Sequence, residues 1–305
     1  MTQTRKNSLI GSVFLALAAI IWGSSFVAQT TGAEFVGPFT FIAFRSLLGS
    51  VALLPVIFVM DTFKKQSKTE EYKKMTKADY KYLFIGGGVC GVVLCAASCL
   101  QQLGIDGGTA PGMAAFITAL YILLVPIFSV FLGKKIRPVI WVCVGVSVAA
   151  LYMLCVKEGG RVQGSDLYVL ACAVCYAVHI LVIDKVSPKL DGVRLSAMQF
   201  FVAGVISFII MLLTEQVSFE ALKSAAWSIA YSGIMSSAVA FTLQILGQQK
   251  TEPTIATMIM SLESVFGVLT AMIVLSQVPT AREALGCVLM FAAIIVAQLP
   301  EKKKA

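Results

Sequence analysis

Three ionisable residues lie inside long apolar runs of this sequence: Arg45, His179 and Glu263. A charge at the centre of a bilayer costs about 2.5 to 3.5 kcal/mol on insertion scales, so such residues are candidates for function. Glu263 could carry a coupling proton, Arg45 could balance an anionic substrate or Glu263, and His179 could bind substrate or relay protons. Each residue also has a structural interpretation. The carboxyl group of Glu263 could hold helices together, the guanidinium of Arg45 could donate to helix carbonyls, and His179 could serve packing alone.

Uncharged polar residues recur at helical spacing in the same runs. Thr254, Thr257, Ser261 and Ser264 are three or four positions apart, as are Ser237, Phe241, Gln244 and Gln248, so each set shares one helix face. Lipid cannot satisfy a glutamine amide, so these faces predict a wet cavity, with interhelical hydrogen bonding as the alternative. The residues predicted to line the cavity, including aromatic walls, are Trp22, Ser98, Gln101, Tyr121, Tyr176, His179, Gln244, Gln248, Thr257, Ser261 and Ser264.

The runs that carry these residues have the length of transmembrane helices. Of the 305 residues, 58% are hydrophobic and 13% charged, against about 45 to 50% and about 25% in soluble domains. A helix of about 20 residues crosses a hydrocarbon core of about 30 Å. The sequence therefore predicts an all-α membrane protein with ten transmembrane helices, near residues 9–29, 38–60, 81–104, 109–132, 138–156, 166–184, 195–214, 226–248, 253–276 and 280–299.

The positive charges predict how the chain is oriented. Nineteen of the 24 Lys and Arg residues fall in segments on the side of the N-terminus and four on the opposite side. Cytoplasmic loops carry the excess of positive charge, so both termini are predicted to be cytoplasmic, in the plasma (inner) membrane. The net charge of +8 therefore reflects topology and contact with the lipid bilayer, and no nucleic-acid partner is expected.

The two halves of the chain resemble each other. Leu100-Gln101-Gln102-Leu103-Gly104 recurs as Leu243-Gln244-Ile245-Leu246-Gly247, and at another offset Trp22 aligns with Tyr176 and Arg45 with Gln199. Five spans in each half is an odd number, so the second half enters the membrane from the opposite side. This predicts two inverted repeats, residues 1–156 and 157–305, with a site at mid-membrane between them.

Three stretches resemble a known family: Ile21-Trp22-Gly23-Ser24-Ser25-Phe26, Thr118-Ala119-Leu120-Tyr121 through to Lys135, and Leu262-Glu263-Ser264-Val265-Phe266. Together they resemble the drug/metabolite transporter (DMT) superfamily and its EamA-like ten-helix transporters. The resemblance implies a basket of ten helices, with spans one, three, four, six, eight and nine around a cavity and spans five and ten at the periphery. A glutamate common in the family at the ends of spans four and nine is replaced here by Lys134 and Gln277.

The predicted function is secondary transport of small metabolites by alternating access, with Glu263 as the candidate residue for coupling transport to protons. An exporter of amino acids or related polar or amphipathic compounds fits the polar faces and Arg45, while an uptake carrier, or a carrier of drugs, nucleotide sugars or vitamins, is an alternative. An intramembrane enzyme is a weaker alternative to a transporter, because no H-E-x-x-H or G-x-S-x-G motif occurs in the sequence.

No cofactor or metal is expected. Cys172 and Cys175 form an isolated C-x-x-C, all eight cysteines lie in apolar segments, and no phosphate-binding loop of the G-x-x-x-x-G-K-[ST] type is present. The energy for transport must then come from gradients. The sequence indicates no oligomeric state.

Overall fold

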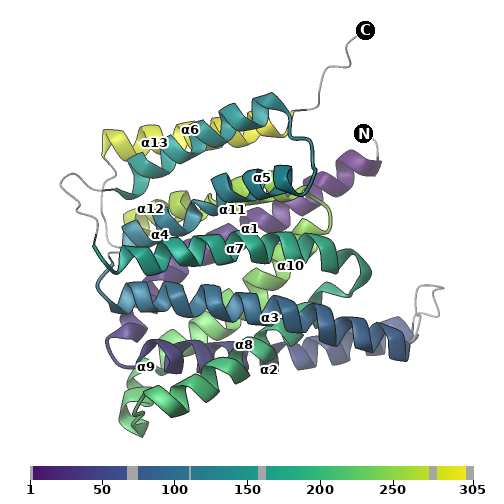
Figure 1. Cartoon of the computed structure of the whole chain (residues 1–305), viewed down its shortest axis with the longest axis vertical. Coiled ribbons are helices and arrows are strands. Elements are labelled where there is room, and N and C mark those ends of the chain that lie inside the picture. The colour runs from purple at the N-terminus through teal and green to yellow at the C-terminus, as the bar shows by residue number, and fades with distance from the viewer. Residues whose placement is uncertain (1–2, 67–74, 110, 157–162, 275–279, 300–305) are drawn as a thin grey trace.

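The computed structural model describes residues 3–66, 75–109, 111–156, 163–274 and 280–299, and this part of the chain is helical without a strand (Figure 1). The helices are α1 (Gln3–Ala33), α2 (Pro38–Gln66), α3 (Lys77–Asp106), α4 (Pro111–Ala119), α5 (Tyr121–Phe131), α6 (Pro138–Cys155), α7 (Asp166–Val186), α8 (Gly192–Thr214), α9 (Phe219–Tyr231), α10 (Phe241–Gln248), α11 (Pro253–Met260), α12 (Glu263–Val274) and α13 (Ala281–Ala297), with a 3₁₀ turn η1 (Ser187–Lys189) and a π-helix η2 (Ser232–Ala240).

Eight helical segments among the described residues are long and apolar enough to cross a membrane. They correspond to the first eight predicted spans. The ninth predicted span consists of α11 and α12, of 8 and 12 residues, and the tenth contains α13, of 17 residues. Gln277 lies outside the described residues. An α-helical membrane protein is therefore confirmed.

Three of the predicted spans are interrupted, which the apolar pattern did not indicate. Leu120 separates α4 from α5, and Ser261 and Leu262 separate α11 from α12. At each break a leucine N–H donates three residues back, Leu120 to the Ile117 carbonyl and Leu262 to the Ile259 carbonyl, both at 3.1 Å. In the third interrupted span, η2 joins α9 to α10, and π-helical turns inside helices frequently mark functional sites.

The helices form a layered bundle in which α6 and α13 pack on each other at one edge (Figure 1). Arg137, just before α6, donates to the carbonyls of Ala297, the last residue of α13, and of Leu299 beyond it, so these two helices run antiparallel. Ser12 in α1 donates to Gln298 at 3.3 Å. The beginning of α1 and the end of α13 therefore lie at the same face of the bundle.

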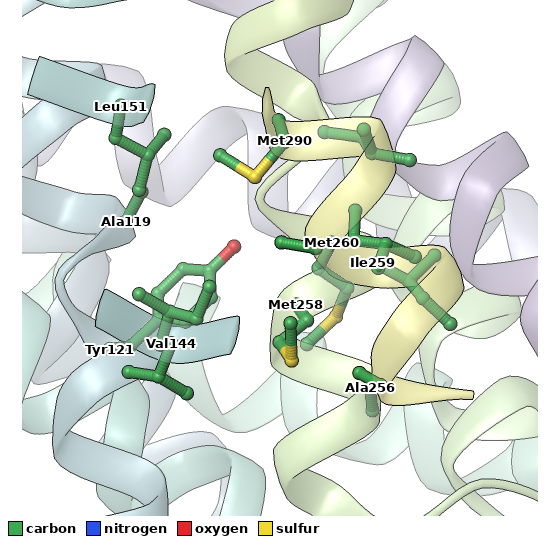
Figure 2. Close-up of a cluster of buried hydrophobic side chains, with 14 of the residues drawn as sticks. Ala119, Tyr121, Val144, Leu151, Ala256, Met258, Ile259, Met260 and Met290 are labelled. Carbon is green, nitrogen blue, oxygen red and sulfur yellow. The ribbon is translucent and has the colours of Figure 1, made fainter. Parts of the chain in front are cut away.

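The largest apolar cluster lies where the broken helices meet. Ala119 and Tyr121 face Met258, Met260 and their neighbours on α11, beside Met290 of α13 (Figure 2). All of these side chains are buried. Methionine fills irregular gaps because its side chain is unbranched and flexible, so this region can repack more easily than one built from β-branched residues.

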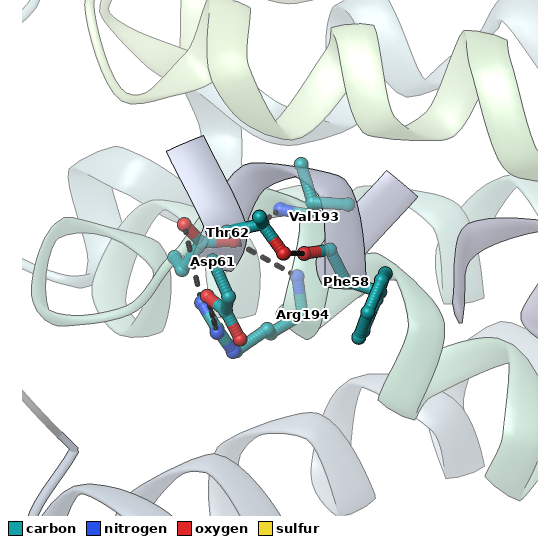
Figure 3. A network of polar contacts seen from close by, with 6 residues as sticks. Phe58, Asp61, Thr62, Val193 and Arg194 are labelled. Atoms are coloured by element: carbon teal, nitrogen blue, oxygen red, sulfur yellow. Dashed lines mark hydrogen bonds and ion pairs between the residues drawn. The ribbon is translucent and has the colours of Figure 1, made fainter. Parts of the chain in front are cut away.

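Helix α2 packs along α8, and polar contacts join the pair at both ends. At one end Arg194 of α8 forms an ion pair with Asp61 of α2 (Figure 3). At the other end Glu215, which follows α8, accepts from the backbone N–H groups of Phe39 and Thr40 at 2.9 and 2.8 Å. This carboxylate caps the N-terminus of α2, where the helix dipole favours negative charge.

Glycines allow several helix backbones to approach each other closely. A Cβ placed on Gly91 of α3 would lie 2.7 Å from the carbonyl oxygen of Gln199 and 2.6 Å from Cβ of Val202, both on α8. Gly87, one turn earlier, faces Met198 of the same helix. The G-x-x-x-G of Gly87 and Gly91 is therefore a close-packing motif.

Gly91→Ala is expected to destabilise the protein by about 1 to 3 kcal/mol, because backbone of α8 cannot move aside as a flexible side chain would. Gly88→Ala on the same helix is the matched control, since a Cβ there meets nothing within 4 Å. Thermal unfolding of the purified proteins in detergent measures the difference. Equal midpoints for the two variants would contradict the close approach of α3 and α8.

Candidate functional site

A buried cavity of about 50 Å³ lies at the centre of the bundle, with room for a few water molecules. Its walls come from α1, α2, α3, α7, η2, α10 and both pairs of broken helices. The lining residues are Trp22, Ser25, Phe26, Gln29, Arg45, Gln101, Thr118, Tyr121, Tyr176, Ile180, Ser236, Phe241, Gln244, Met260 and Glu263. None comes from α6 or α13, in agreement with the peripheral place that the family resemblance implies for spans five and ten.

Arg45 is buried at the cavity wall, although span two was not expected to reach the cavity. Its Nη1 donates to Oε1 of Gln29 at 3.1 Å, and its guanidinium carbon lies 6.0 Å from the ring centroid of Phe41. Its Nε has no hydrogen-bond partner. No carboxylate of the described residues lies within ion-pair distance, so the suggested Arg45–Glu263 pair is absent.

Glu263 is the first residue of α12, directly after the break, and its side chain is 5% exposed. The hydroxyl of Tyr121 donates to its Oε1 at 3.4 Å. Tyr121 is likewise the first residue of α5, directly after the other break, and its hydroxyl points toward α11 (Figure 2). The two broken helices thus contact each other through a carboxyl group and a phenol at the cavity wall.

The glutamines join helices and also line the cavity. Gln101 of α3 donates to the hydroxyl of Thr118 on α4, and Gln244 of α10 donates to Gln248, both at 3.0 Å. Gln248 in turn donates to the backbone carbonyl of Ile180 on α7. Oε1 of Gln244 has no partner. Both interpretations of the glutamines therefore apply. Of the three predicted to line the cavity, Gln101 and Gln244 do so and Gln248 does not, and Gln29 of α1 lines it as well.

Six of the predicted cavity residues are not among the lining residues. Ser98 lies just behind the wall, with its Oγ 3.4 Å from the hydroxyl of Tyr176. Thr257 and Ser261 donate to carbonyls three residues back in their own helix, at 2.8 and 2.7 Å. The other three, also buried away from the lining, are His179, Gln248 and Ser264.

The stripe predicted on the ninth span does not line the cavity as a set. In α11 Met260 lines the cavity and Thr257 does not, and after the break Glu263 lines it and Ser264 does not. Nε2 of His179 donates to Oε1 of Gln199 on α8 at 3.0 Å, and the centroid of the His179 ring lies 6.2 Å from that of Phe241. It belongs to helix packing in this conformation.

On α1 only Trp22 was predicted to line the cavity. Ser25, Phe26 and Gln29 line it together with Trp22, and the four residues are spaced like one side of a helix. This spacing was a usable signal. The other lining residues that were not predicted are Thr118, Ile180, Ser236, Phe241 and Met260.

The chemistry of the cavity suits binding. An aromatic wall, with Trp22 edge-on to Phe241 at 4.8 Å, faces a small set of amides, hydroxyls, one guanidinium and one carboxyl group. Ligand sites commonly combine apolar walls with a few polar groups that orient the ligand. Among the described residues, no group of three or more His, Cys, Asp or Glu residues is placed to hold a metal ion.

Comparisons with a family model, with curated proteins and with solved structures each give a match. The model of the EamA-like transporter family matches residues 9–156 and 163–298. An uncharacterized transporter of Archaeoglobus fulgidus is 26% identical over 297 residues, which is 95% of this chain and 86% of that protein. A solved crystal structure superposes with a TM-score of 0.74 over 96% of each chain at 18% identity, which shows a common fold.

The family model therefore covers almost all of the helical chain, including every residue that lines the cavity. The relative of similar length is named as a transporter as well. This chain belongs to the EamA-like transporter family, within the drug/metabolite transporter superfamily, and is a membrane transporter.

Proposed function

We propose that this transporter moves small metabolites by alternating access between two inverted five-helix halves, residues 1–156 and 157–305. The observation that carries the proposal is a buried polar cavity that both halves line, at the point where two broken helices meet. Discontinuous helices in corresponding positions of two halves are a recognised pointer to the site of a secondary transporter.

Contacts between the halves occur in exchangeable pairs. A Cβ on Gly104 would meet the carbonyl oxygen of Ser165 at 3.2 Å, and one on Gly247 would meet that of Gly11 at 3.0 Å. The repeat aligns Gly104 with Gly247, and at the offset that aligns Trp22 with Tyr176 it aligns Gly11 with Ser165. Exchanging the two halves therefore turns one contact into the other, as a two-fold pseudosymmetry axis requires.

The polar ends of the α2–α8 pair follow the same exchange. The offset that aligns Arg45 with Gln199 also aligns Thr40 with Arg194 and Asp61 with Glu215. In the structure Arg194 contacts Asp61, and Thr40 contacts Glu215. An acidic residue at the end of each helix thus contacts the beginning of the other, which supports antiparallel, equivalent roles for α2 and α8.

The π-helix accounts for a one-residue difference between the halves. A Cβ on Gly91 would approach the Gln199 carbonyl, and one on Gly233 would approach the Arg45 carbonyl at 2.9 Å, so Gly91 and Gly233 are equivalent. They are 142 positions apart, whereas Leu100 and Leu243 are 143 apart. The extra residue falls within Ser232–Ala240, and a π-helical turn is how a helix accommodates an insertion.

Such an arrangement provides two conformations of similar energy. If each half can adopt the geometry of the other, the cavity opens to one side of the membrane in one state and to the opposite side in the exchanged state. The cavity described here is small, about 50 Å³, so a metabolite fits only when its walls separate. The methionines beside the breaks can repack during this movement.

The polar groups favour a substrate with several hydrogen-bonding atoms and an apolar body. Amino acids or related polar or amphipathic compounds have this character, and export across the plasma membrane, with both termini cytoplasmic, is the proposed direction. Uptake, or transport of drugs, nucleotide sugars or vitamins, is the alternative within the same fold. Energy comes from a gradient, with Glu263 as the proposed coupling acid.

The proposal is tested by efflux and uptake of a labelled amino-acid and metabolite panel in proteoliposomes, with and without a pH gradient. We expect saturable flux of at least one compound. Vesicles shown to be tight and correctly loaded, but without protein-dependent flux of any member of the panel, would contradict the proposed substrate range.

Gln101→Ala is expected to raise KM for the transported compound about fivefold to tenfold, because the amide at the cavity wall is lost. Gln102→Ala is the control: this neighbour is equally buried but donates to the backbone carbonyl of Gln29 and does not line the cavity. Initial rates of uptake over a concentration series measure both. The same KM in the two variants would argue that Gln101 serves packing alone.

Glu263→Gln is expected to remove the dependence of transport on the pH gradient, because an amide cannot bind and release a proton. Flux down the substrate gradient should persist. Glu220→Gln, at an exposed position in the first turn of α9, is the control and should keep the dependence. A stable Glu263→Gln protein with wild-type coupling would eliminate Glu263 as the coupling acid.

A further inference from the structure

Arg45 has three possible roles, and the contacts in the structure separate them. A structural arginine would donate to helix carbonyls, but its only hydrogen bond within the described residues is to the side chain of Gln29. A partner of Glu263 would lie within 4.0 Å of it, and no such ion pair is present in the described chain. The remaining role is to balance a charge that enters from outside the protein.

The energetics favour the same conclusion. A guanidinium remains charged, and Arg45 is only 3% exposed, with one neutral amide oxygen and the ring of Phe41 as its contacts among the described residues. Buried charges are normally paired, and breaking up such a pair leaves a costly isolated ion. Arg45 is in that isolated condition here, at the wall of the central cavity and with its Nε unpartnered.

We propose that Arg45 binds a carboxylate group of the transported substrate, with Gln29 occupying this place while the cavity is empty of substrate. This inference deepens the proposed transport function and rests on it. A carboxylate accepts stronger hydrogen bonds from a guanidinium than an amide oxygen does, and in a bidentate geometry where space allows. The substrate therefore displaces Oε1 of Gln29 from Nη1 of Arg45.

The rest of the cavity defines what accompanies the carboxylate. Trp22, Phe241 and Tyr176 provide an apolar wall for a hydrophobic body, and Gln101 and Gln244 provide amides for further polar atoms. The equivalent position in the second half is Gln199, which pairs with buried His179 away from the cavity lining. The carboxylate subsite is thus present once, on the α2 side.

The test compares each acid with its own uncharged amide. Phenylalanine, leucine and 3-phenylpropionate, and the primary amide of each, are titrated into the full-length protein in lipid nanodiscs, and binding is followed by intrinsic tryptophan fluorescence and thermal stabilisation. For at least one pair, wild-type protein is expected to bind the acid about tenfold more tightly than the amide. Arg45→Gln should reduce this preference to less than about twofold.

Two further variants keep the test decisive. Arg45→Lys preserves the positive charge but not the planar fork, and should retain a weaker preference for the acid even if Arg45→Gln folds poorly. Gln199→Ala, at the equivalent buried position, should leave the preference unchanged. Wild-type protein that does not distinguish acid from amide in any pair, or Arg45→Gln protein that still does, overturns the carboxylate subsite.

The outcome is separable from that of the transport assay. Saturable flux of compounds that carry no carboxylate would uphold the transporter and overturn the role of Arg45. Flux restricted to carboxylates, and lost in Arg45→Gln but not in Gln199→Ala, would support both.

Discussion

Hydrocarbon offers no hydrogen-bond partner, and this constraint governs the whole molecule. Backbone groups are satisfied within helices, and side-chain polar groups must find one another, a backbone carbonyl or a water-filled space. Gln248 reaches the Ile180 carbonyl, Glu215 caps α2, and His179 pairs with Gln199. Among the buried side-chain atoms of the described residues that have no partner, Trp22 Nε1, Arg45 Nε and Gln244 Oε1 belong to side chains that line the cavity, where water or substrate can reach them.

The same constraint explains why helix packing relies on glycine. Apolar side chains gain nothing by leaving lipid for another apolar surface, so close backbone approach and dispersion must hold the helices together. Gly23 illustrates this: a Cβ there would lie 2.7 Å from the Glu263 carbonyl and 2.8 Å from the Gly267 amide. The beginning of α12 therefore packs closely against α1, and the position of Glu263 depends on the absence of a side chain at Gly23.

The fold could be predicted largely because apolar length is a strong signal, while the breaks could not. Nothing in the apolar run around Leu120 or Leu262 signals an interruption, since no glycine or proline stands at either residue. The interruptions arise from tertiary packing, and they redirect side chains that a continuous helix would align. Of the predicted residues, Trp22, Gln101, Tyr121, Tyr176 and Gln244 line the cavity, whereas Thr257, Ser261 and Ser264, beside the break between α11 and α12, do not.

If the two halves are inverted repeats as proposed, equivalent positions of the two halves carry different side chains at the cavity. Tyr121 and Glu263 each follow a break and contact each other, yet one is a phenol and the other a carboxyl group. Arg45 is matched by Gln199, and η2 has no counterpart in α3. Symmetric packing supplies two conformations of comparable energy, but a symmetric lining would bind a polar substrate equally well in either orientation. A positive charge in the first half alone gives the substrate a defined orientation. The residues that line the cavity must therefore differ between the halves, although the helix packing around them is alike.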